Sequence, residues 1–477
     1  MPSILIAAFD GLQPSQVRPD LMPNLVRFAS GGVFFENHHP VFPSVTRINA
    51  ASMVTGTYSG KHGLAANTMV ARDYDPTSAF SALEPTLADM ARKTGRVLLA
   101  PTLADILADH GMEYTAIGVG TSGNAYVHNP RAHESGGATI HPDFTLPYDL
   151  SAKLESRFGA WPDEAMPNTP RLDHAVRILT EHILPECQPA VALIWSSEPD
   201  KAQHATGVGS EMSDRAIREA DARFGSMLEW LETNGRSSDT DVLVISDHGY
   251  STIQETVNAE WYTRDAGFSP QDVIVAPNGG SVLFYCRNQD VTQRLAAWLT
   301  ERPWCGALLA SEAAGRIDGT LPMSLAGADG PRAPELAMSF GWDSRPNDAG
   351  YNGFVYSSGG QPGQGQHGSM SRHEMNNVLL ARGPSFKQAV RIQSPTGNVD
   401  LAPTLLRLLG LPVREEMDGR VIVESLADGP GSVDWSSETH RAERQTSDGV
   451  YCQHIRTSRV GSTTYLDEGS GTRVQSS

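Results

Sequence analysis

Short apolar runs that end in polar residues recur along the chain and alternate with segments of helical periodicity. Continuous hydrophobic runs of this length predict strands that are buried on both faces, as in parallel α/β sheets. We expect five such strands, at Ile4–Phe9, Tyr114–Val119, Val191–Trp195, Val242–Ile245 and Val378–Ala381.

Helical segments with capping signals lie between these strands. Thr102 is expected to begin a helix that Gly111 ends, and Ser213 is expected to cap a longer helix that closes at Gly235. A further helix is expected over Leu401–Leu409. Alternating strands and helices predict an α/β fold: a three-layer α/β/α domain with a mostly parallel central sheet.

Residues 251–364 depart from this alternation, because they are rich in Gly, Pro, Asp and Ser. We interpret them as an inserted cap region that shapes substrate specificity. Residues 1–250 and 365–477 then form the catalytic core. Weak alternation over Gly449–Leu466 predicts a terminal hairpin.

Composition narrows the functional classes. The chain has 477 residues, of which 39% are hydrophobic, so it can bury a large core and is not globally disordered. Its net charge of −18 argues against a nucleic-acid polymer as partner. An anionic substrate would need local positive charge, which a metal cluster would supply.

Cysteine usage and hydropathy bear on location. The four cysteines are scattered without a CxxC pair, which predicts reduced thiols and no disulfide framework. We find no basic region before the first apolar run and no run of 18 apolar residues, so we expect no leader and no membrane partner. We therefore expect a cytoplasmic protein. Its oligomeric state, monomer or homodimer, stays open.

Carboxylates and imidazoles follow several of the predicted strands. Asp10 follows the first strand, Asp200 and His204 follow the third, and Asp247 and His248 end the fourth. Because ligands bind at the carboxyl ends of strands in such sheets, we expect these side chains to converge. An alternative explanation for an Asp at the end of a strand is that it only caps the next helix. Capping does not explain why several strand ends carry Asp or His together. This mixture of oxygen and nitrogen ligands suits Zn²⁺, with Mn²⁺ as the second choice.

Two further positions carry candidate chemistry. His367 has a glycine on its C-terminal side, which leaves its ring free; the alternatives are a plain surface histidine and nearby His373 as the ligand. Thr46 is expected near a helix N-terminus, where backbone amides favour an alkoxide and a bound phosphate. Taken alone, Ser44 or Thr46 is better explained as a helix cap.

The full set of motifs, in its order along the chain, resembles the nucleotide pyrophosphatase/phosphodiesterase branch of the alkaline phosphatase superfamily. Ordered agreement from the first strand to about residue 410 is more specific than any single pair. The motifs are Asp10, Phe42-Pro43-Ser44 with Thr46 and Asn49, Thr55-Gly56, His62-Gly63 with Asn67, Glu198-Pro199-Asp200 with His204 and Gly207, Asp247-His248-Gly249, His367-Gly368, Ala381-Arg382-Gly383-Pro384 and Asp400-Leu401-Ala402-Pro403-Thr404-Leu405.

The resemblance implies a role for each residue at a site with two Zn²⁺. Thr46 would be the nucleophile, forming a phospho-threonine intermediate, and its oxygen would be a further metal ligand. Asn67 would donate to a phosphoryl oxygen, aided by the Thr46 amide. Asp200, His204 and His367 would hold one zinc, and Asp10, Asp247 and His248 would hold the other.

Two departures from the family pattern bear on the substrate, a small-molecule phosphate or phosphonate ester. Monoesterases and phosphonoacetate hydrolases of this branch place a cationic clamp where this chain has Gly120–Tyr126, with no cation before Arg131. Arg47 stands where many nucleotide pyrophosphatases carry an aromatic that stacks a nucleobase. Because the cationic clamp is missing, we expect a zinc-dependent phosphodiesterase or nucleotide pyrophosphatase. The alternative is a phosphonate hydrolase of the phosphonoacetate type or a phosphomonoesterase.

Two other functional classes fit the sequence less well. A cofactor-independent phosphoglycerate mutase shares the fold but uses Ser where Thr46 stands. A degenerate binding protein would be expected to have lost ligands, whereas all six ligands and the nucleophile are present.

Overall fold

A ten-stranded sheet forms the centre of the molecule. The structure is a computed structural model that describes residues 3–475. Strand order is β20-β2-β19-β9-β1-β8-β5-β6-β7, with β21 also beside β2. Six of the nine strand pairs are parallel, which confirms the predicted mostly parallel α/β fold. The strands are β1 (Ser3–Phe9), β2 (Val33–His39), β5 (Tyr114–Gly118), β6 (Ala138–His141), β7 (Phe144–Leu146), β8 (Val191–Ser196), β9 (Thr240–Ile245), β19 (Asn377–Arg382), β20 (Val390–Ile392) and β21 (Thr396–Gly397).

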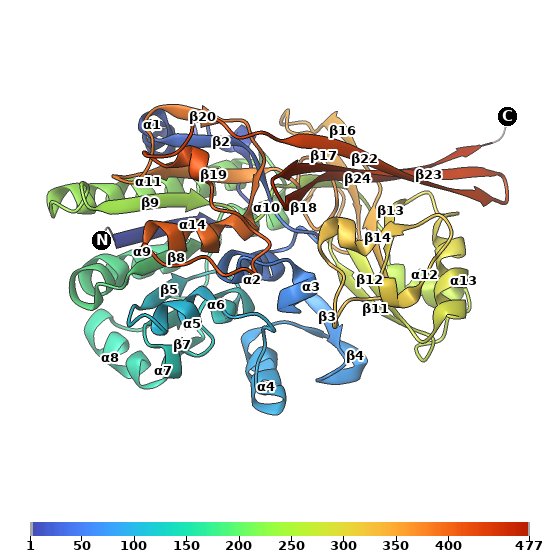
Figure 1. Cartoon of the computed structure of the whole chain (residues 1–477), viewed down its shortest axis with the longest axis horizontal. Coiled ribbons are helices and arrows are strands. Elements are labelled where there is room, and N and C mark those ends of the chain that lie inside the picture. The colour runs from blue at the N-terminus through green and yellow to red at the C-terminus, as the bar shows by residue number, and fades with distance from the viewer. Residues whose placement is uncertain (1–2, 476–477) are drawn as a thin grey trace.

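Helices cover both faces of this sheet (Figure 1). Successive residues of β1 alternate between two hydrophobic cores, Ile4 and Ile6 on one face and Leu5 and Ala7 on the other. This explains why the strand is apolar at every position. One face packs against α2 (Thr46–Thr55), α4 (Glu84–Thr94), α5 (Leu103–Ala108), α6 (Ser122–His128), α7 (Ala132–Ser135) and α14 (Leu401–Leu408), and the other against α1 (Pro23–Gly31), α8 (Asp149–Phe158), α9 (Thr169–Ile178) and α11 (Glu211–Thr233).

Three local predictions need correction. Ser210, not Ser213, caps α11: the Ser210 hydroxyl accepts the Ser213 amide, so the helix starts earlier than expected. The helix after Thr102 ends at Ala108, before Gly111. Strand β19 runs antiparallel to both of its neighbours, which a continuous apolar run does not reveal.

Residues 251–364 are largely built from two smaller sheets. Helices α12 (Ala259–Asp265) and α13 (Gln289–Leu299) accompany them, at the right of Figure 1. The division into a core and an inserted cap stays a prediction. The sheets have the orders β16-β17-β10-β18 and β11-β12-β15-β13-β14. Their strands are β10 (Ser251–Thr256), β11 (Val273–Asn278), β12 (Ser281–Cys286), β13 (Cys305–Ala310), β14 (Leu321–Pro322), β15 (Leu336–Phe340), β16 (Trp342–Pro346), β17 (Asn352–Ser357) and β18 (Gly365–Gln366).

The C-terminal segment forms a three-stranded antiparallel sheet of β22 (Ser436–Thr446), β23 (Gly449–Val460) and β24 (Thr463–Gln475). The predicted hairpin covers only part of it. The sheet packs on the 251–364 region through Gln453, whose side chain accepts from the Leu308 amide at 2.8 Å and donates to the Leu308 carbonyl at 3.0 Å and the Gly319 carbonyl at 2.6 Å. Among residues 3–475 no helix is both long and apolar enough to cross a membrane.

Replacing Gln453 by Ala should destabilise this junction. The Leu308 amide and carbonyl would lose their partner in a buried setting, which costs on the order of 1–3 kcal/mol for an unsatisfied group. We expect a lower melting temperature by calorimetry. The matched control is exposed Gln445 on β22, where Gln445→Ala should leave the melting temperature nearly unchanged. Equal shifts in the two variants would contradict the proposed docking.

Candidate active site

Six potential metal ligands from distant parts of the chain form two groups at one edge of the central sheet. Within each group, the ligand atoms all lie within 4.8 Å of one another. Parallel β1, β8 and β9 bring three of the carboxylates together, because their carboxyl ends meet at this edge. The groups are Asp200, His204 and His367, and Asp10, Asp247 and His248.

The three imidazoles are held in one common way. Each ring places its Nδ1 against a backbone carbonyl, which fixes Nδ1 as the protonated nitrogen. Each Nε2 is then free to act as a metal ligand. The pairs are His204 with Gly365 at 3.2 Å, His248 with Gly249 at 3.0 Å and His367 with Ser44 at 2.8 Å.

The Nε2 atoms crowd together in a way that a cation would explain. His204 Nε2 and His367 Nε2 lie 3.1 Å apart, and Asp200 Oδ1 lies 3.3 and 3.4 Å from them. Two imidazole lone pairs that face each other with a carboxylate beside them are typical of ligands around one ion. The ring of His248 stacks on His367 at a centroid distance of 3.6 Å, so the two groups are neighbours.

Buried carboxylate oxygens in the second group also fit a cation. His248 Nε2 lies 3.1 Å from Asp247 Oδ2 and 3.7 Å from Asp10 Oδ1. Neither of these oxygens has a hydrogen-bond partner in the part of the chain that the structure describes. Their companion oxygens are occupied: Asp10 Oδ2 accepts from Trp195 at 3.0 Å and Asp247 Oδ1 accepts from the Gly11 amide at 2.9 Å. An orphaned buried carboxylate oxygen is costly unless it binds an ion.

Electrostatic repulsion between the carboxylates is a further feature that favours a bound cation. Burial, followed by the charges of Asp247 and Asp200, raises the pKa of Asp10 well above its usual value. At Asp200 burial acts in the same direction, but His204 and His367 outweigh it and the pKa falls well below the usual range. Burial lowers the pKa of His367 to about 4, which keeps its ring neutral and able to bind a metal.

Thr46 lies beside these groups as the first residue of α2. Its Oγ1 is 3.4 Å from His248 Nε2. Among residues 3–475, no acceptor takes up the Thr46 amide, as expected at a helix N-terminus. Asn67 lies alongside, and its side-chain carbonyl accepts from the Arg47 amide at 2.9 Å. This bond to the first turn of α2 orients the Asn67 side chain and leaves its amino group available as a hydrogen-bond donor.

The sequence reasoning missed a polar link between α2 and the second ligand group. Asn398 donates both to Asn49 Oδ1 and to the Asp247 carbonyl, each at 2.8 Å. Asn49 in turn accepts from the Val41 amide at 2.7 Å. Asn49 belonged to the recognised motifs, but Asn398 lies in a different segment, and only the fold brings it here.

Tyr250 is a second residue that the sequence reasoning missed. It directly follows Asp247-His248-Gly249, and its buried hydroxyl donates to Asp200 Oδ1 at 2.7 Å. Its proximity to this motif was the available signal. His373, the competitor considered for His367, belongs to neither ligand group and instead contacts the Ser344 hydroxyl at 2.9 Å.

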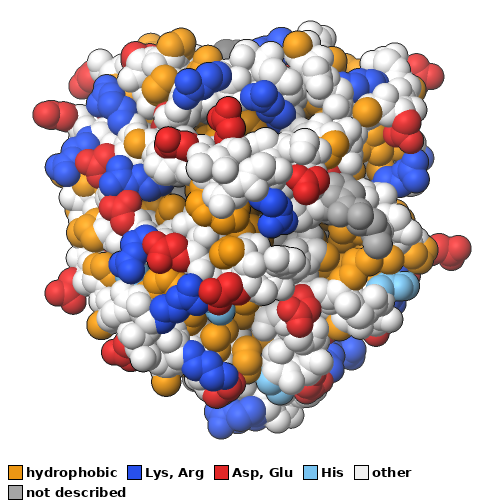
Figure 2. Space-filling view, turned by 90° about the vertical axis from the view of Figure 1, so that its left-hand side faces the viewer, with side chains coloured by type: hydrophobic (Ala, Val, Ile, Leu, Met, Phe, Trp, Pro, Cys, Tyr) orange, Lys and Arg blue, Asp and Glu red, His pale blue; other side chains and the backbone are white. Residues whose placement is uncertain are grey.

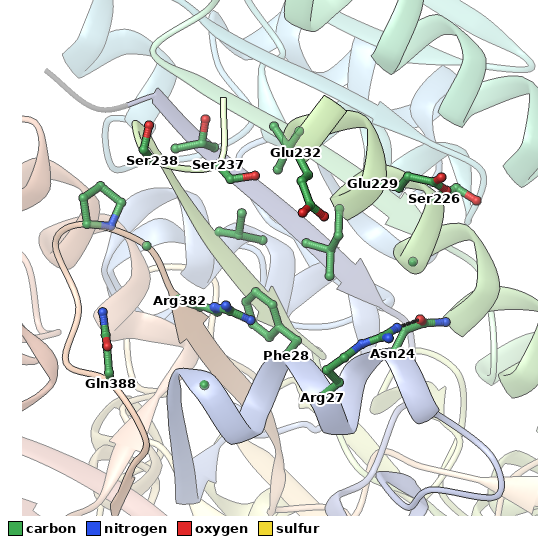
Figure 3. A pocket seen from close by; sticks show the side chains of 18 of the residues that line it. Asn24, Arg27, Phe28, Ser226, Glu229, Glu232, Ser237, Ser238, Arg382 and Gln388 are labelled. Atoms are coloured by element: carbon green, nitrogen blue, oxygen red, sulfur yellow. Dashed lines mark hydrogen bonds between the residues drawn. The ribbon is translucent and has the colours of Figure 1, made fainter. Parts of the chain in front are cut away.

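A large hollow of about 1160 Å³ lies elsewhere on the molecule. Figure 3 shows Arg27, Arg382, Glu229 and Glu232 around it, a mixture of both charges. Thr240, at the start of β9, lines this hollow, whereas the candidate site follows the end of β9. At the usual rise per residue of a strand, the two lie roughly 20 Å apart. The hollow is therefore not part of the candidate site.

Replacing Tyr250 by Phe should weaken divalent-cation binding. The change removes the hydrogen bond that orients Asp200, and loss of such a supporting contact typically reduces metal affinity about 10–100-fold. Titration against a chromophoric chelator measures the affinity. Tyr351 is a matched control, because it packs in the same small cluster and its hydroxyl has no hydrogen-bond partner among the described residues. A similar loss in Tyr351→Phe would show that the effect is one of packing.

Comparisons with known proteins agree with this geometry. Residues 4–347 match the family described as type I phosphodiesterase / nucleotide pyrophosphatase. A bis(5'-adenosyl)-triphosphatase of Mus musculus is 23% identical over 418 residues, which span 86% of this chain and 78% of that protein.

Solved structures share the fold at lower identity. Human ectonucleotide pyrophosphatase/phosphodiesterase 5 matches with a TM-score of 0.63 at 17% identity, covering 89% of this chain and 100% of that one. The murine protein, as an inactive variant in complex with AMP, matches with a TM-score of 0.61 at 18% identity, covering 87% and 96%. The predicted family is confirmed: the chain belongs to the type I phosphodiesterase/nucleotide pyrophosphatase family and is a hydrolytic enzyme.

Proposed function

We propose that this phosphodiesterase cleaves small-molecule phosphate diesters through a covalent phospho-threonine at Thr46, next to two bound divalent cations. The observation that carries the proposal is the position of the Thr46 hydroxyl. It lies at the free N-terminus of a buried helix and contacts His248 of one ligand group. A hydroxyl in this setting is favoured as an alkoxide by the helix dipole and by nearby positive charge.

Two metal positions follow from the ligand groups. Asp200, His204 and His367 would hold one cation, and Asp10, Asp247 and His248 would hold the other, with Thr46 Oγ1 as a further ligand. Zn²⁺ fits this mixture of imidazole and carboxylate best, and Mn²⁺ is the second choice. When bound, the cations supply positive charge that favours the deprotonated hydroxyl and offsets charge on the phosphoryl oxygens.

The protein groups then have defined roles. Thr46 Oγ1 forms a bond to phosphorus as the bond to the leaving oxygen breaks, and that oxygen departs with the electron pair. A water molecule subsequently adds to phosphorus and loses a proton as the bond to Thr46 Oγ1 breaks, and uptake of one proton by Oγ1 restores the hydroxyl. The Thr46 amide and the Asn67 amino group donate to the phosphoryl oxygens, and loss of one such donor costs about 3–4 kcal/mol of barrier.

A diester substrate is supported by the loop at 120–126, which contains no cation to bind the extra charge of a monoester. A nucleotide is supported by the mouse relative named bis(5'-adenosyl)-triphosphatase and by the AMP in the murine structure. A long nucleic acid is not expected, since the net charge is −18. Figure 2 shows acidic and basic side chains interspersed on one face of the protein, without a broad basic area among the side chains drawn there.

The cytoplasmic location is also a proposal. It is supported by the cysteines, all four of which are free thiols.

Metal removal and restoration should reveal both the cofactor and the substrate preference. We expect chelated protein to lose its activity and Zn²⁺ or Mn²⁺ to restore it, with two ions bound per chain. The restored enzyme should hydrolyse bis-p-nitrophenyl phosphate in preference to p-nitrophenyl phosphate and phosphonoacetate, because the cationic clamp is missing. Release of p-nitrophenol or inorganic phosphate measures the rates. A strong preference for the monoester or the phosphonate would overturn the diesterase proposal.

Replacing Thr46 by Val should remove the nucleophile while keeping the shape of the side chain. We expect kcat on bis-p-nitrophenyl phosphate to fall on the order of 10³-fold or more, with metal content retained. In the unaltered enzyme, acid quenching during turnover of this diester should trap a p-nitrophenyl phosphoryl group on the peptide that contains Thr46, detected by mass spectrometry. Thr94→Val, at the end of α4 away from the ligand groups, serves as control and should keep full activity. A phosphoryl group trapped on another residue would contradict the assignment.

A further inference from the structure

Arg47 follows the proposed nucleophile, and its side chain is only 8% exposed. Its guanidinium donates to three neutral oxygens: the backbone carbonyl of Asn67 at 3.0 Å, the Ser81 hydroxyl at 3.2 Å and the Thr121 hydroxyl at 3.4 Å. These bonds use Nε and Nη1. Within residues 3–475 the Nη2 group donates to no protein acceptor, so part of the fork remains free for a ligand.

Two other arginines with largely buried side chains have carboxylate partners. Arg332, which is 3% exposed, forms two bonds to Asp73, at 2.9 and 2.6 Å. Arg420 likewise binds Glu424, at 2.7 and 2.9 Å. Among the described residues, Arg47 forms no such ion pair. A buried guanidinium without an anion is costly, so its position next to the nucleophile favours an anion supplied by the substrate.

The helix determines which part of the substrate Arg47 can reach. Adjacent side chains on an α-helix diverge by about 100°, so Arg47 does not face the same point as Thr46. Its guanidinium donates to the Asn67 backbone carbonyl, and the Arg47 amide donates to the Asn67 side chain, so Arg47 and Asn67 are direct neighbours. In an in-line attack, the leaving group departs opposite Thr46 Oγ1, and the group that stays on phosphorus lies to the side. A side chain next to Asn67 that does not face the same point as Thr46 is therefore placed to reach the retained group.

We propose that Arg47 binds a second anionic group, a carboxylate or a phosphate, on the part of the substrate that stays attached to phosphorus. This inference rests on the proposed function. It makes Arg47 a specificity determinant for diesters that carry an additional negative charge beyond the one at the reacting phosphorus. The free Nη2 group can donate to such an anion while Nε and Nη1 stay bonded to the protein, which holds the planar guanidinium in place.

Three esters with one leaving group test this proposal: propyl, 2-carboxyethyl and 2-phosphonoethyl p-nitrophenyl phosphate. They share the leaving group and the charge at the reacting phosphorus and differ in the retained group. For the metal-loaded enzyme we expect kcat/KM to be about tenfold or more higher for at least one of the two charged esters than for the propyl ester. Inhibition constants of the matching products, the three alkyl phosphates without p-nitrophenol, should show the same preference as a measure of binding alone.

Variants separate recognition from structure. Arg47→Met should remove the preference for the charged ester, and Arg47→Lys should retain part of it, because the charge remains but the fork is lost. Arg131→Met is the matched control: Arg131 is an exposed residue that pairs with Glu134 and Asp105, and its replacement should leave the preference unchanged. Because the result is a ratio between esters, a general loss of folded enzyme does not mimic it.

Each other outcome has a separate meaning. Equal rates on all three esters in the unaltered enzyme would overturn the inference about Arg47. Equal losses on all three in Arg47→Met would also overturn it, since Arg47 would then act on the reacting phosphoryl group. If the metal-loaded enzyme hydrolyses none of the esters, the proposed function itself fails.

Discussion

Mutual repulsion among three clustered carboxylates is the constraint on which the rest of this site depends. Asp10, Asp200 and Asp247 meet at one edge of the sheet because they follow parallel neighbouring strands. Burial, followed by the charges of Asp247 and Asp200, raises the pKa of Asp10, and within residues 3–475 two of the buried carboxylate oxygens have no hydrogen-bond partner. Such an arrangement is costly unless a carboxylate takes up a proton or positive charge is placed beside it. The three imidazoles, each fixed by a backbone carbonyl with Nε2 inward, are arranged to share cations with these carboxylates.

The strands and the convergence of the six candidate ligands could be predicted because their signals are local. A strand buried on both faces must be apolar throughout, and Asp10, Asp200 and Asp247-His248 then follow such strands directly. Other features depend on packing that the sequence does not encode locally. Ser210 and Ser213 are both good helix caps, and only the observed bond between them shows which one begins α11. Likewise, β19 has the apolar composition of a parallel strand yet runs antiparallel.

The contacts around the ligands were the hardest part to foresee. Asn398 acts through bonds to residues about 150 and 350 positions away, so nothing near it in the sequence indicates its role. The docking of the C-terminal sheet on the 251–364 region depends on Gln453, a polar residue whose partners are backbone atoms of another strand. Backbone partners have no side-chain signature, and such contacts cannot be inferred from residue types.

The proposed nucleophile and the candidate ligands are joined by a rigid connection, which has a consequence for the proposed chemistry. Asn49 lies one turn along α2 from Thr46, and Asn398 bridges it to the Asp247 backbone. All the residues of α2 are buried, so the helix is held by packing along its whole length. A helix fixed at both its packing surface and its polar link has little freedom to move Thr46 relative to Asp247 and His248. Positioning of this kind lowers a barrier because the entropy of alignment is lost on folding and not in the reaction. The same rigidity explains why Arg47, carried by the first turn of this helix, can present its charge at a fixed distance from the reacting phosphorus.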